Sequence, residues 1–186
     1  MLKTITGSAK GRKLITLEVD ATRPTSERIK GAIFSSIQFD IENRRVLDLF
    51  AGSGQMGLEA LSRGAGSAMF IDASREAMDI VKKNAEKTGL FEKSRFLVSD
   101  FRNYIRKAAG RDRFHVIYID PPYKESFARD AVLLILKAGL AHPGALIVTE
   151  SDKEDIFEGE MPKELSVLKQ KRYGISFITI FRFMPD

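Results

Sequence analysis

The sequence contains no cysteine and only two histidines, His115 and His142. Without cysteine the chain can form neither a disulfide nor a thiolate metal site, and a reducing compartment is compatible with this composition. Two histidines cannot make an imidazole-rich metal site, so we expect no metal. The longest apolar run, residues 131–136, is far shorter than the ~20 residues of a membrane helix, and residues 1–14 lack the apolar centre of a signal peptide. We therefore expect a soluble, cytoplasmic protein with no membrane partner.

A length of 186 residues suits one domain, and residues 1–186 are expected to form it. The net charge is +5, and residues 1–30 account for +4 of it because they hold seven bases and three acids. The bases are Lys3, Lys10, Arg12, Lys13, Arg23, Arg28 and Lys30, and the acids are Glu18, Asp20 and Glu27. This basic segment is either a solubilising surface or a surface for a phosphate backbone, and charge alone leaves both open.

The first 44 residues predict a small β-hairpin followed by a helix. Short strand patterns at 2–5 and 13–17 flank a segment with two glycines, which is typical of a turn. Thr25 or Ser26 can cap the helix that follows, whose apolar residues recur at helical spacing as far as Ile37. We expect residues 1–44 to provide the surface that contacts a phosphate backbone, and residues 45–183 to form the core of the domain.

From residue 45 onward, apolar strands alternate with helices. The expected strands are 46–50, 68–71, 96–98, 116–119 and 145–149, and the expected helices are one through Leu58 and Leu61, then 77–87, 101–108 and 127–137. This alternation implies a parallel sheet with both faces covered. Two further strand patterns, 165–170 and 175–183, are joined by a tight turn and should be antiparallel. The predicted α/β fold is a seven-stranded, mostly parallel Rossmann-like sheet that ends in an antiparallel hairpin, as in class I methyltransferases.

A glycine-rich turn follows the first strand of this sheet. Residues 52–57, GSGQMG, match the pattern G-x-G-x-x-G, and Asp72 lies 20 residues after Gly52 at the end of the second strand. Glycines let the backbone approach a nucleoside cofactor, and the acid can accept hydrogen bonds from ribose hydroxyls. NAD and S-adenosylmethionine both satisfy this pattern, and so does a tight turn without any ligand.

Two further acids favour S-adenosyl-L-methionine as the cofactor. Asp48 lies inside the first strand, where its carboxylate could approach the turn backbone or the cationic amino-acid end of the cofactor. Asp100 could accept from an adenine amine while Phe101 packs on the ring, although an aspartate there is also typical of a helix N-cap. The residues predicted to bind the cofactor are Asp48, Phe50, Ala51, Gly52, Ser53, Gly54, Met56, Gly57, Asp72, Ala73, Ser74, Asp100 and Phe101.

A proline-rich quartet, Asp120-Pro121-Pro122-Tyr123, follows the fourth strand and is the predicted catalytic centre. Prolines are stiff and have no N–H, so they can hold carbonyl oxygens outward. Asp120 and the Pro121 carbonyl supply two acceptors for an –NH2 group, and Tyr123 supplies a face on which a base can stack. Accepting both N–H bonds frees the nitrogen lone pair to attack a methyl group. Whether Asp120 takes the proton stays open, and a plain loop start with Tyr123 in the core is the alternative.

Residues 48–54 and 120–123 resemble motifs I and IV of the amino-group methyltransferases. The pieces that resemble the bacterial RsmD family are ITG at 5–7, KGRKL at 10–14, RPT at 23–25, ERIK at 27–30, Phe34, and GLEALSRG at 57–64. The likeness covers residues 1–183. It implies S-adenosylmethionine-dependent methylation of the N2 amine of guanine 966 in 16S ribosomal RNA, on an assembling 30S subunit.

The resemblance also places Thr25 over the cofactor and makes the basic N-terminal region an RNA contact. The residues predicted to bind RNA are Lys10, Arg12, Lys13, Arg23, Arg28 and Lys30, and the protein is expected to be a monomer. The sequence departs from the family pattern at Gly31, where an acid is usual, and at Ser35, where asparagine is usual. These departures bear on how the first helix reads RNA.

Four other functions share parts of this pattern. DNA adenine-N6 methyltransferases also use Asp-Pro-Pro-Tyr but add a long target-recognition region, whereas only 44 residues precede this sheet. Glutamine methyltransferases usually have asparagine at position 120. An NAD-dependent oxidoreductase would need a catalytic pair such as Tyr-x-x-x-Lys, which the sequence lacks. A non-enzymatic RNA-binding module would show the same basic N-terminus.

Overall fold

The structure is a computed structural model that describes residues 2–16, 26–122 and 127–185. Three residues singled out by the sequence, Arg23, Thr25 and Tyr123, lie outside the described residues. The predictions made for them therefore stay predictions.

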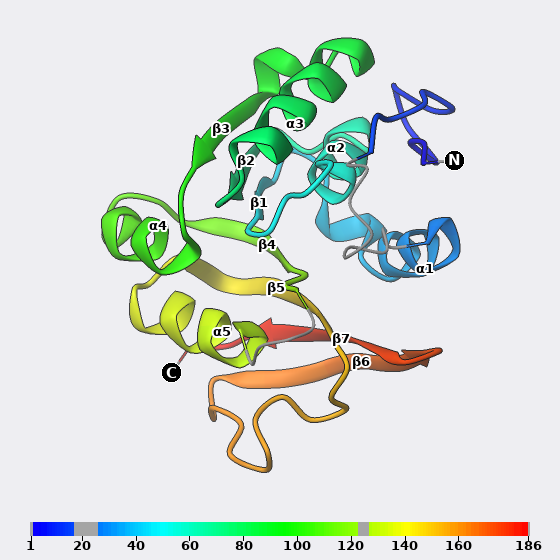
Figure 1. The fold of residues 1–186 in the computed structure, drawn as a ribbon. Coiled ribbons are helices and arrows are strands. Elements are labelled where there is room, and N and C mark those ends of the chain that lie inside the picture. The colour runs from blue at the N-terminus through cyan, green and yellow to red at the C-terminus, as the bar shows by residue number, and fades with distance from the viewer. Residues whose placement is uncertain (1, 17–25, 123–126, 186) are drawn as a thin grey trace.

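Seven strands form one sheet in the order β3-β2-β1-β4-β5-β7-β6 (Figure 1). The strands are β1 (Arg45–Asp48), β2 (Ser67–Asp72), β3 (Ser94–Val98), β4 (Phe114–Ile119), β5 (Ala141–Ser151), β6 (Leu165–Tyr173) and β7 (Ser176–Phe183). Strands β1 to β5 are parallel, whereas β7 runs antiparallel to both β5 and β6. The predicted mostly parallel sheet with a final antiparallel hairpin is confirmed.

Helices cover both faces of the sheet. They are α1 (Glu27–Ser36), α2 (Gln55–Ser62), α3 (Arg75–Thr88), α4 (Phe101–Ala108) and α5 (Phe127–Lys137), with short 3-10 turns at Gln38–Asp40 and Phe91–Lys93. Neighbouring strand residues point to opposite faces, so Val46 packs under α1, α2 and α3 while Leu47 packs under α4 and α5. This double burial explains why the parallel strands are continuous apolar runs in the sequence.

Three helices begin at side chains that accept backbone N–H groups. The Ser26 hydroxyl accepts from Ile29 N at 3.3 Å and begins α1. Ser74 accepts from Ala77 N at 3.2 Å and begins α3, and Asp100 does the same for α4. Ser26, one of the two residues predicted to cap the first helix, is confirmed in this role.

The N-terminal segment forms a hairpin, as the sequence predicts, but a shorter one. Two backbone hydrogen bonds flank the antiparallel bridge between Lys3 and Lys13, and no longer strand forms at 2–5 or in the described part of 13–17. The segment also lies against α2, and Gly7, at φ +86°, sits so close that a Cβ would be 1.7 Å from the Ser62 carbonyl oxygen. Contact with α2 therefore adds to the short strand pairing.

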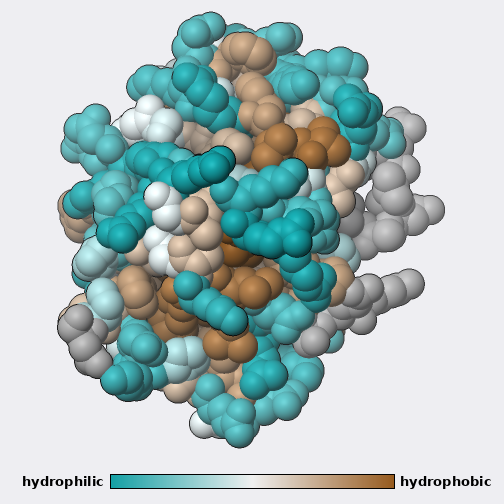
Figure 2. Space-filling view, turned by 90° about the vertical axis from the view of Figure 1, so that its left-hand side faces the viewer, coloured by the Kyte–Doolittle hydropathy of each residue, from teal (hydrophilic) through white to brown (hydrophobic). Residues whose placement is uncertain are grey.

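Figure 2 shows one face of the molecule, which is mostly hydrophilic, with one group of apolar residues near the lower middle and a second at the upper right. Among the described residues, no helix is both long enough and apolar enough to cross a membrane.

Candidate active site

The carboxyl ends of the central strands bring the predicted motifs together. Asp48, the last residue of β1, lies beside Phe70 of β2 on one side and Tyr118 of β4 on the other. The glycine turn follows Asp48, and Asp120 follows Tyr118 by two residues. Both motifs therefore leave the same edge of the sheet from neighbouring strands, which is where open α/β sheets bind ligands.

The three glycines of the turn meet different steric demands. Gly52 and Gly54 adopt φ of +54° and +76°, which favour glycine. A Cβ on Gly54 would lie 2.8 Å from Val81, and one on Gly57 would lie 2.3 Å from the Phe70 ring. A Cβ on Gly52 would meet nothing within 4 Å. The turn is thus packed tightly against the core at two glycines and open at the third, where a ligand could approach its backbone.

Asp72 holds the glycine turn against the end of β2. Its Oδ2 accepts from Gly52 N at 2.9 Å, and its Oδ1 accepts from Ser74 N at 2.8 Å. A carboxylate has about four lone-pair sites, so these two bonds leave capacity for hydroxyl donors. Asp72 is therefore well placed for the predicted ribose contact, which stays a prediction.

Asp48 is a buried carboxylate beside the turn. It is 4% exposed, and its Oδ2 accepts from Gly57 N at 2.9 Å. Burial raises the pKa of Asp48 to about 7, the Gly57 N–H opposes that rise, and the nearby negative charge of Asp72 adds to it. No basic side chain in the described part of the chain forms an ion pair with Asp48. A cationic group entering the site would therefore stabilise its ionised form.

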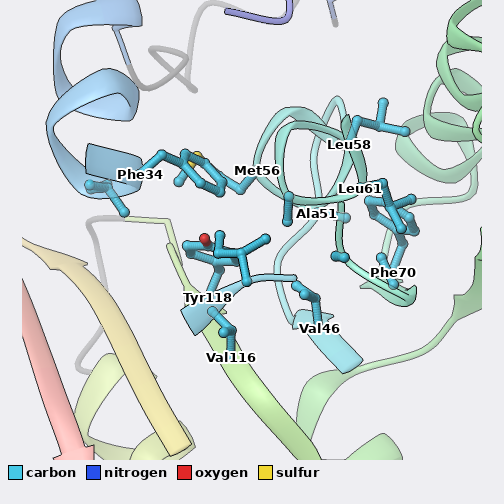
Figure 3. Packing of buried hydrophobic residues seen from close by; sticks show 14 of the residues in the cluster. Phe34, Val46, Ala51, Met56, Leu58, Leu61, Phe70, Val116 and Tyr118 are labelled. Atoms are coloured by element: carbon cyan, nitrogen blue, oxygen red, sulfur yellow. The ribbon is translucent and has the colours of Figure 1, made fainter. Parts of the chain in front are cut away.

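Tyr118 is a polar residue of this region that was not among the predicted site residues. Figure 3 shows its ring lying close to Phe34 of α1 and Met56 of α2, and the Phe34 and Tyr118 ring centres are 5.6 Å apart. Its hydroxyl is buried and has no hydrogen-bond partner among the described residues. Burial, and then the charge of Asp48, raise the pKa of Tyr118 well above its usual value. A tyrosine within the apolar run 116–119, two residues before the quartet, was the available signal.

Asp100 and Phe101 have structural roles. Asp100 Oδ1 accepts from the backbone N of Arg102 at 2.9 Å and of Asn103 at 3.2 Å. Asp100 therefore caps α4, which is the alternative role that its position in the sequence allowed. The Phe101 ring is 3% exposed and lies 5.1 Å from the Phe50 ring. Its place in the core contrasts with the expected role as a surface for adenine, and adenine contacts by either residue stay predictions.

The other predicted cofactor residues divide into buried and accessible groups. Ala51 and Met56 are buried in the core, whereas Ala73 and Ser74 are exposed after β2. The Ser53 carbonyl accepts from Asn84 Nδ2 at 2.9 Å. Side chains of the buried pair stabilise the fold, and the exposed pair lies where a ligand could reach it.

Asn84 of α3 is a second residue of this region that was not among the predicted site residues. It is fully buried, and besides the Ser53 carbonyl it binds Ile15, accepting from its N at 2.7 Å and donating to its O at 2.9 Å. One amide therefore joins the glycine turn to the N-terminal segment. A lone asparagine in an amphipathic helix carries no sequence signal for this long-range role.

The catalytic quartet begins directly after β4. Asp120 is half-buried, Pro121 is buried and Pro122 is exposed. Burial of Pro121 holds the backbone next to Asp120 in place. The catalytic roles themselves stay predictions.

The predicted RNA-binding residues fall into two groups. Lys10, Arg12, Lys13 and Arg28 are exposed, and a phosphate could reach all of them. Lys30 is fully buried; its Nζ donates to the Lys3 carbonyl at 2.6 Å and lies 3.9 Å from Glu59 Oε2. The prediction that Lys30 contacts RNA is wrong, because the helix turns this residue toward α2.

Glu59 is the centre of the buried network that holds Lys30. It is fully buried and accepts from Ile5 N at 2.7 Å, Thr6 N at 3.1 Å and Arg63 Nε at 2.8 Å. Burial lowers the pKa of Lys30, and the charge of Glu59 opposes that change. Glu59 therefore attaches both the N-terminal segment and α1 to the core.

Comparison with known proteins extends over nearly the whole chain. The profile of the family described as "Conserved hypothetical protein 95" matches residues 2–182. Ribosomal RNA small subunit methyltransferase D of Haemophilus influenzae is 30% identical over 175 residues, 94% of this chain and 90% of that protein. The Bacillus subtilis protein YlbH, provisionally named an rRNA methyltransferase, is 34% identical over 97% of this chain and 98% of its own.

A solved Escherichia coli structure, provisionally described as a methyltransferase, has a TM-score of 0.87 at 28% identity, covering 100% of this chain and 99% of that one. The predicted class I methyltransferase fold is thus confirmed. The family profile and the relatives of matching length agree on one conclusion: the chain belongs to the RsmD family.

Proposed function

We propose that the protein is an S-adenosylmethionine-dependent methyltransferase that modifies the N2 amine of a guanine in 16S ribosomal RNA. The observation that carries the proposal is the place of Asp120-Pro121-Pro122, which leaves β4 directly beside the glycine turn and Asp48 of β1. An acceptor pair and a nucleoside-binding turn on neighbouring strands are what methyl transfer to an amine requires. Family membership points to the same chemistry.

The residues around the turn fit S-adenosylmethionine. The open side of Gly52 admits a close-lying ligand, and Asp72 can accept from ribose hydroxyls. Asp48 places an unpaired carboxylate where the cationic amino-acid end of the cofactor would offset its charge. When bound, the cofactor supplies an electrophilic methyl group on sulfur.

The quartet acts on the nucleophile. Asp120 and the Pro121 carbonyl accept the two N–H bonds of the amine, which keeps the nitrogen lone pair out of conjugation with the base and directs it toward the methyl group. Positioning and fixed dipoles supply most of the catalysis, and Tyr123 stacks on the base. After transfer the nitrogen loses one proton, and Asp120 is the one carboxylate that the quartet offers to accept it.

Family membership supports the choice of ribosomal RNA as the substrate. Relatives named ribosomal RNA small subunit methyltransferase D cover most of this chain, and the exposed bases Lys10, Arg12, Lys13 and Arg28 suit a phosphate backbone. A transfer assay with labelled S-adenosylmethionine tests this by comparing 30S particles, naked 16S RNA and duplex DNA, followed by mapping of the modified base. Label on guanine N2 of 16S RNA supports the proposal, and label on adenine N6 of DNA overturns it.

The catalytic role is tested by Asp120→Ala. We expect methyl transfer to fall by about a thousandfold, because positioned acceptors at a reacting centre have effects of this order, while S-adenosylmethionine affinity by calorimetry stays near that of the wild type. A variant that keeps its activity would remove the quartet from the mechanism. Asp79→Ala, on the exposed side of α3, is the control.

A further inference from the structure

The C-terminal hairpin is a second concentration of positive charge. Residues 165–183 contain Lys169, Lys171, Arg172 and Arg182 and no acid, so their charge equals that of the first 30 residues. β6 is the edge strand of the sheet, and every residue from 166 to 172 is exposed. Basic residues on an edge strand can serve merely to prevent strand pairing between molecules, so charge alone does not assign a function.

The arrangement of this charge is more specific than edge protection needs. Lys169, Lys171 and Tyr173 lie on the face of β6 that is turned toward α1, and together with α1 and β7 they line a groove. Lys169 Nζ donates to Ser36 Oγ of α1 at 2.8 Å, which fixes the two elements side by side. Lys171 Nζ lies 5.5 Å from the centre of the Tyr173 ring. The groove therefore has a lysine rim and an aromatic end.

The floor of the groove is apolar. Ile33 of α1 and Ile178 and Ile180 of β7 form it, and they are almost completely buried, so the accessible surface belongs mainly to the two lysines and Tyr173. Among the described residues, no acidic side chain lines the groove. A phosphate ion or an acidic peptide would need only the lysines. A nucleotide matches both parts of the accessible surface, since its base suits the aromatic ring while its phosphate suits the lysines.

The groove opens at the same edge of the sheet as the candidate active site. Ser151, the last residue of β5, pairs with Phe177, and Tyr173 pairs with Ser176, so the β6–β7 turn lies at the carboxyl ends of the parallel strands. Figure 1 shows α1 and this turn on one side of the molecule. Arg28, on the same helix α1, is also exposed.

We propose that the groove between α1 and β6 is a second RNA-contact surface, which holds the ribosomal RNA strand that flanks the target base. The proposal rests on the proposed function and deepens it. Lys169 and Lys171 bind backbone phosphates, and Tyr173 stacks on an unpaired base. The RNA then contacts the protein on both sides of the active site, at the N-terminal bases and at this groove.

The test is the double variant Lys169→Ala/Lys171→Ala, with Lys82→Ala/Lys83→Ala as the control. The control removes the same charge from exposed positions of α3. Binding of fluorescent 16S RNA fragments is measured by anisotropy between 50 and 200 mM salt. We expect the groove variant to bind more weakly and its log–log salt slope to shrink by about 1.4, which is roughly 0.7 per lost contact to single-stranded phosphate. The control should match the wild type.

Two further readouts separate the outcomes. Unchanged thermal unfolding and S-adenosylmethionine affinity would show that the groove variant is folded, and Tyr173→Leu should weaken RNA binding without changing the salt slope. If the wild type methylates 16S RNA but the groove variant keeps its salt slope, the groove is not an RNA contact although the proposed function stands. A variant that binds naked RNA normally and fails only on 30S particles would overturn the proposal in favour of a protein contact. If the wild type neither binds nor methylates RNA, the proposed function itself fails.

Discussion

Asp48→Asn should change how stability depends on pH. In the folded protein burial raises the pKa of Asp48 from 3.8 to about 7, which corresponds to about 4 kcal/mol because one pKa unit is worth about 1.4 kcal/mol. The folded pKa lies above the unfolded value, so the stability contributed by this group is fully present below pH 3.8. It is lost as the pH rises through about 7.

The variant removes this titration and keeps a carbonyl oxygen that can accept from the Gly57 N–H. Between about pH 5 and pH 8 the free energy of unfolding of the wild type should therefore fall by roughly 2 to 3 kcal/mol relative to that of Asp48→Asn. This is the portion of the 4 kcal/mol that falls in this pH range. The new amide can add a constant offset if its N–H groups lack partners. The quantity to be compared is the difference in unfolding free energy between the wild type and Asp48→Asn, and the prediction concerns how this difference changes with pH. A constant offset therefore cancels.

The assay is urea unfolding followed by circular dichroism at several pH values between 5 and 8. Asp79→Asn, at an exposed position of α3, is the matched control and should run parallel to the wild type. Saturating S-adenosylmethionine should reduce the pH dependence of the wild type, because a cation beside Asp48 favours its ionised form. Parallel profiles for the wild type and Asp48→Asn would refute the argument that Asp48 is a desolvated, unpaired carboxylate.

Three further variants test other parts of the structure. Glu59→Ala leaves Lys30 charged in the core without its carboxylate, so the free energy of unfolding should fall by about 3–5 kcal/mol in urea titrations; a loss under 1 kcal/mol would contradict the network. Asp72→Ala removes an acceptor for ribose hydroxyls and should weaken S-adenosylmethionine binding by roughly tenfold or more in calorimetry, whereas equal affinity would count against that assignment. Arg12→Glu with Lys13→Glu should weaken RNA binding and flatten its dependence on salt concentration. If the salt dependence of RNA binding is unchanged, these bases only make the surface soluble.

The sheet was predictable because its physical signal is local. Each central strand is a short apolar run, and residues such as Val46 and Leu47 both had to be apolar because they face opposite helix layers. The glycine turn and the quartet were predictable for a related reason, since glycine permits backbone conformations that other residues rarely adopt and proline fixes φ wherever it occurs. The final strands were separable from the rest because only a two-residue turn lies between them.

Lys30 shows where charge counting misleads. The sequence places it three, four and seven residues before Ile33, Phe34 and Ile37, which puts it on the buried stripe of α1. Glu59 likewise lies between Leu58 and Ala60 in a helix whose residues are all buried. Two opposite charges on apolar faces indicate an internal ion pair, and helical spacing was sufficient to predict it. The error came from counting bases along the chain without asking which face carried them.

Other contacts could not be obtained from the sequence, because they depend on which surfaces meet after folding. Asn84 binds Ile15 and Ser53, which are 69 and 31 residues away, and no local pattern marks an asparagine as the link between two such segments. The consequence is functional. The basic N-terminal segment and the glycine turn share one buried amide, since Asn84 hydrogen-bonds both to Ile15 and to the Ser53 carbonyl. The protein therefore holds its expected RNA-contacting region and its expected cofactor turn in one fixed relation, which methyl transfer between two bound molecules requires.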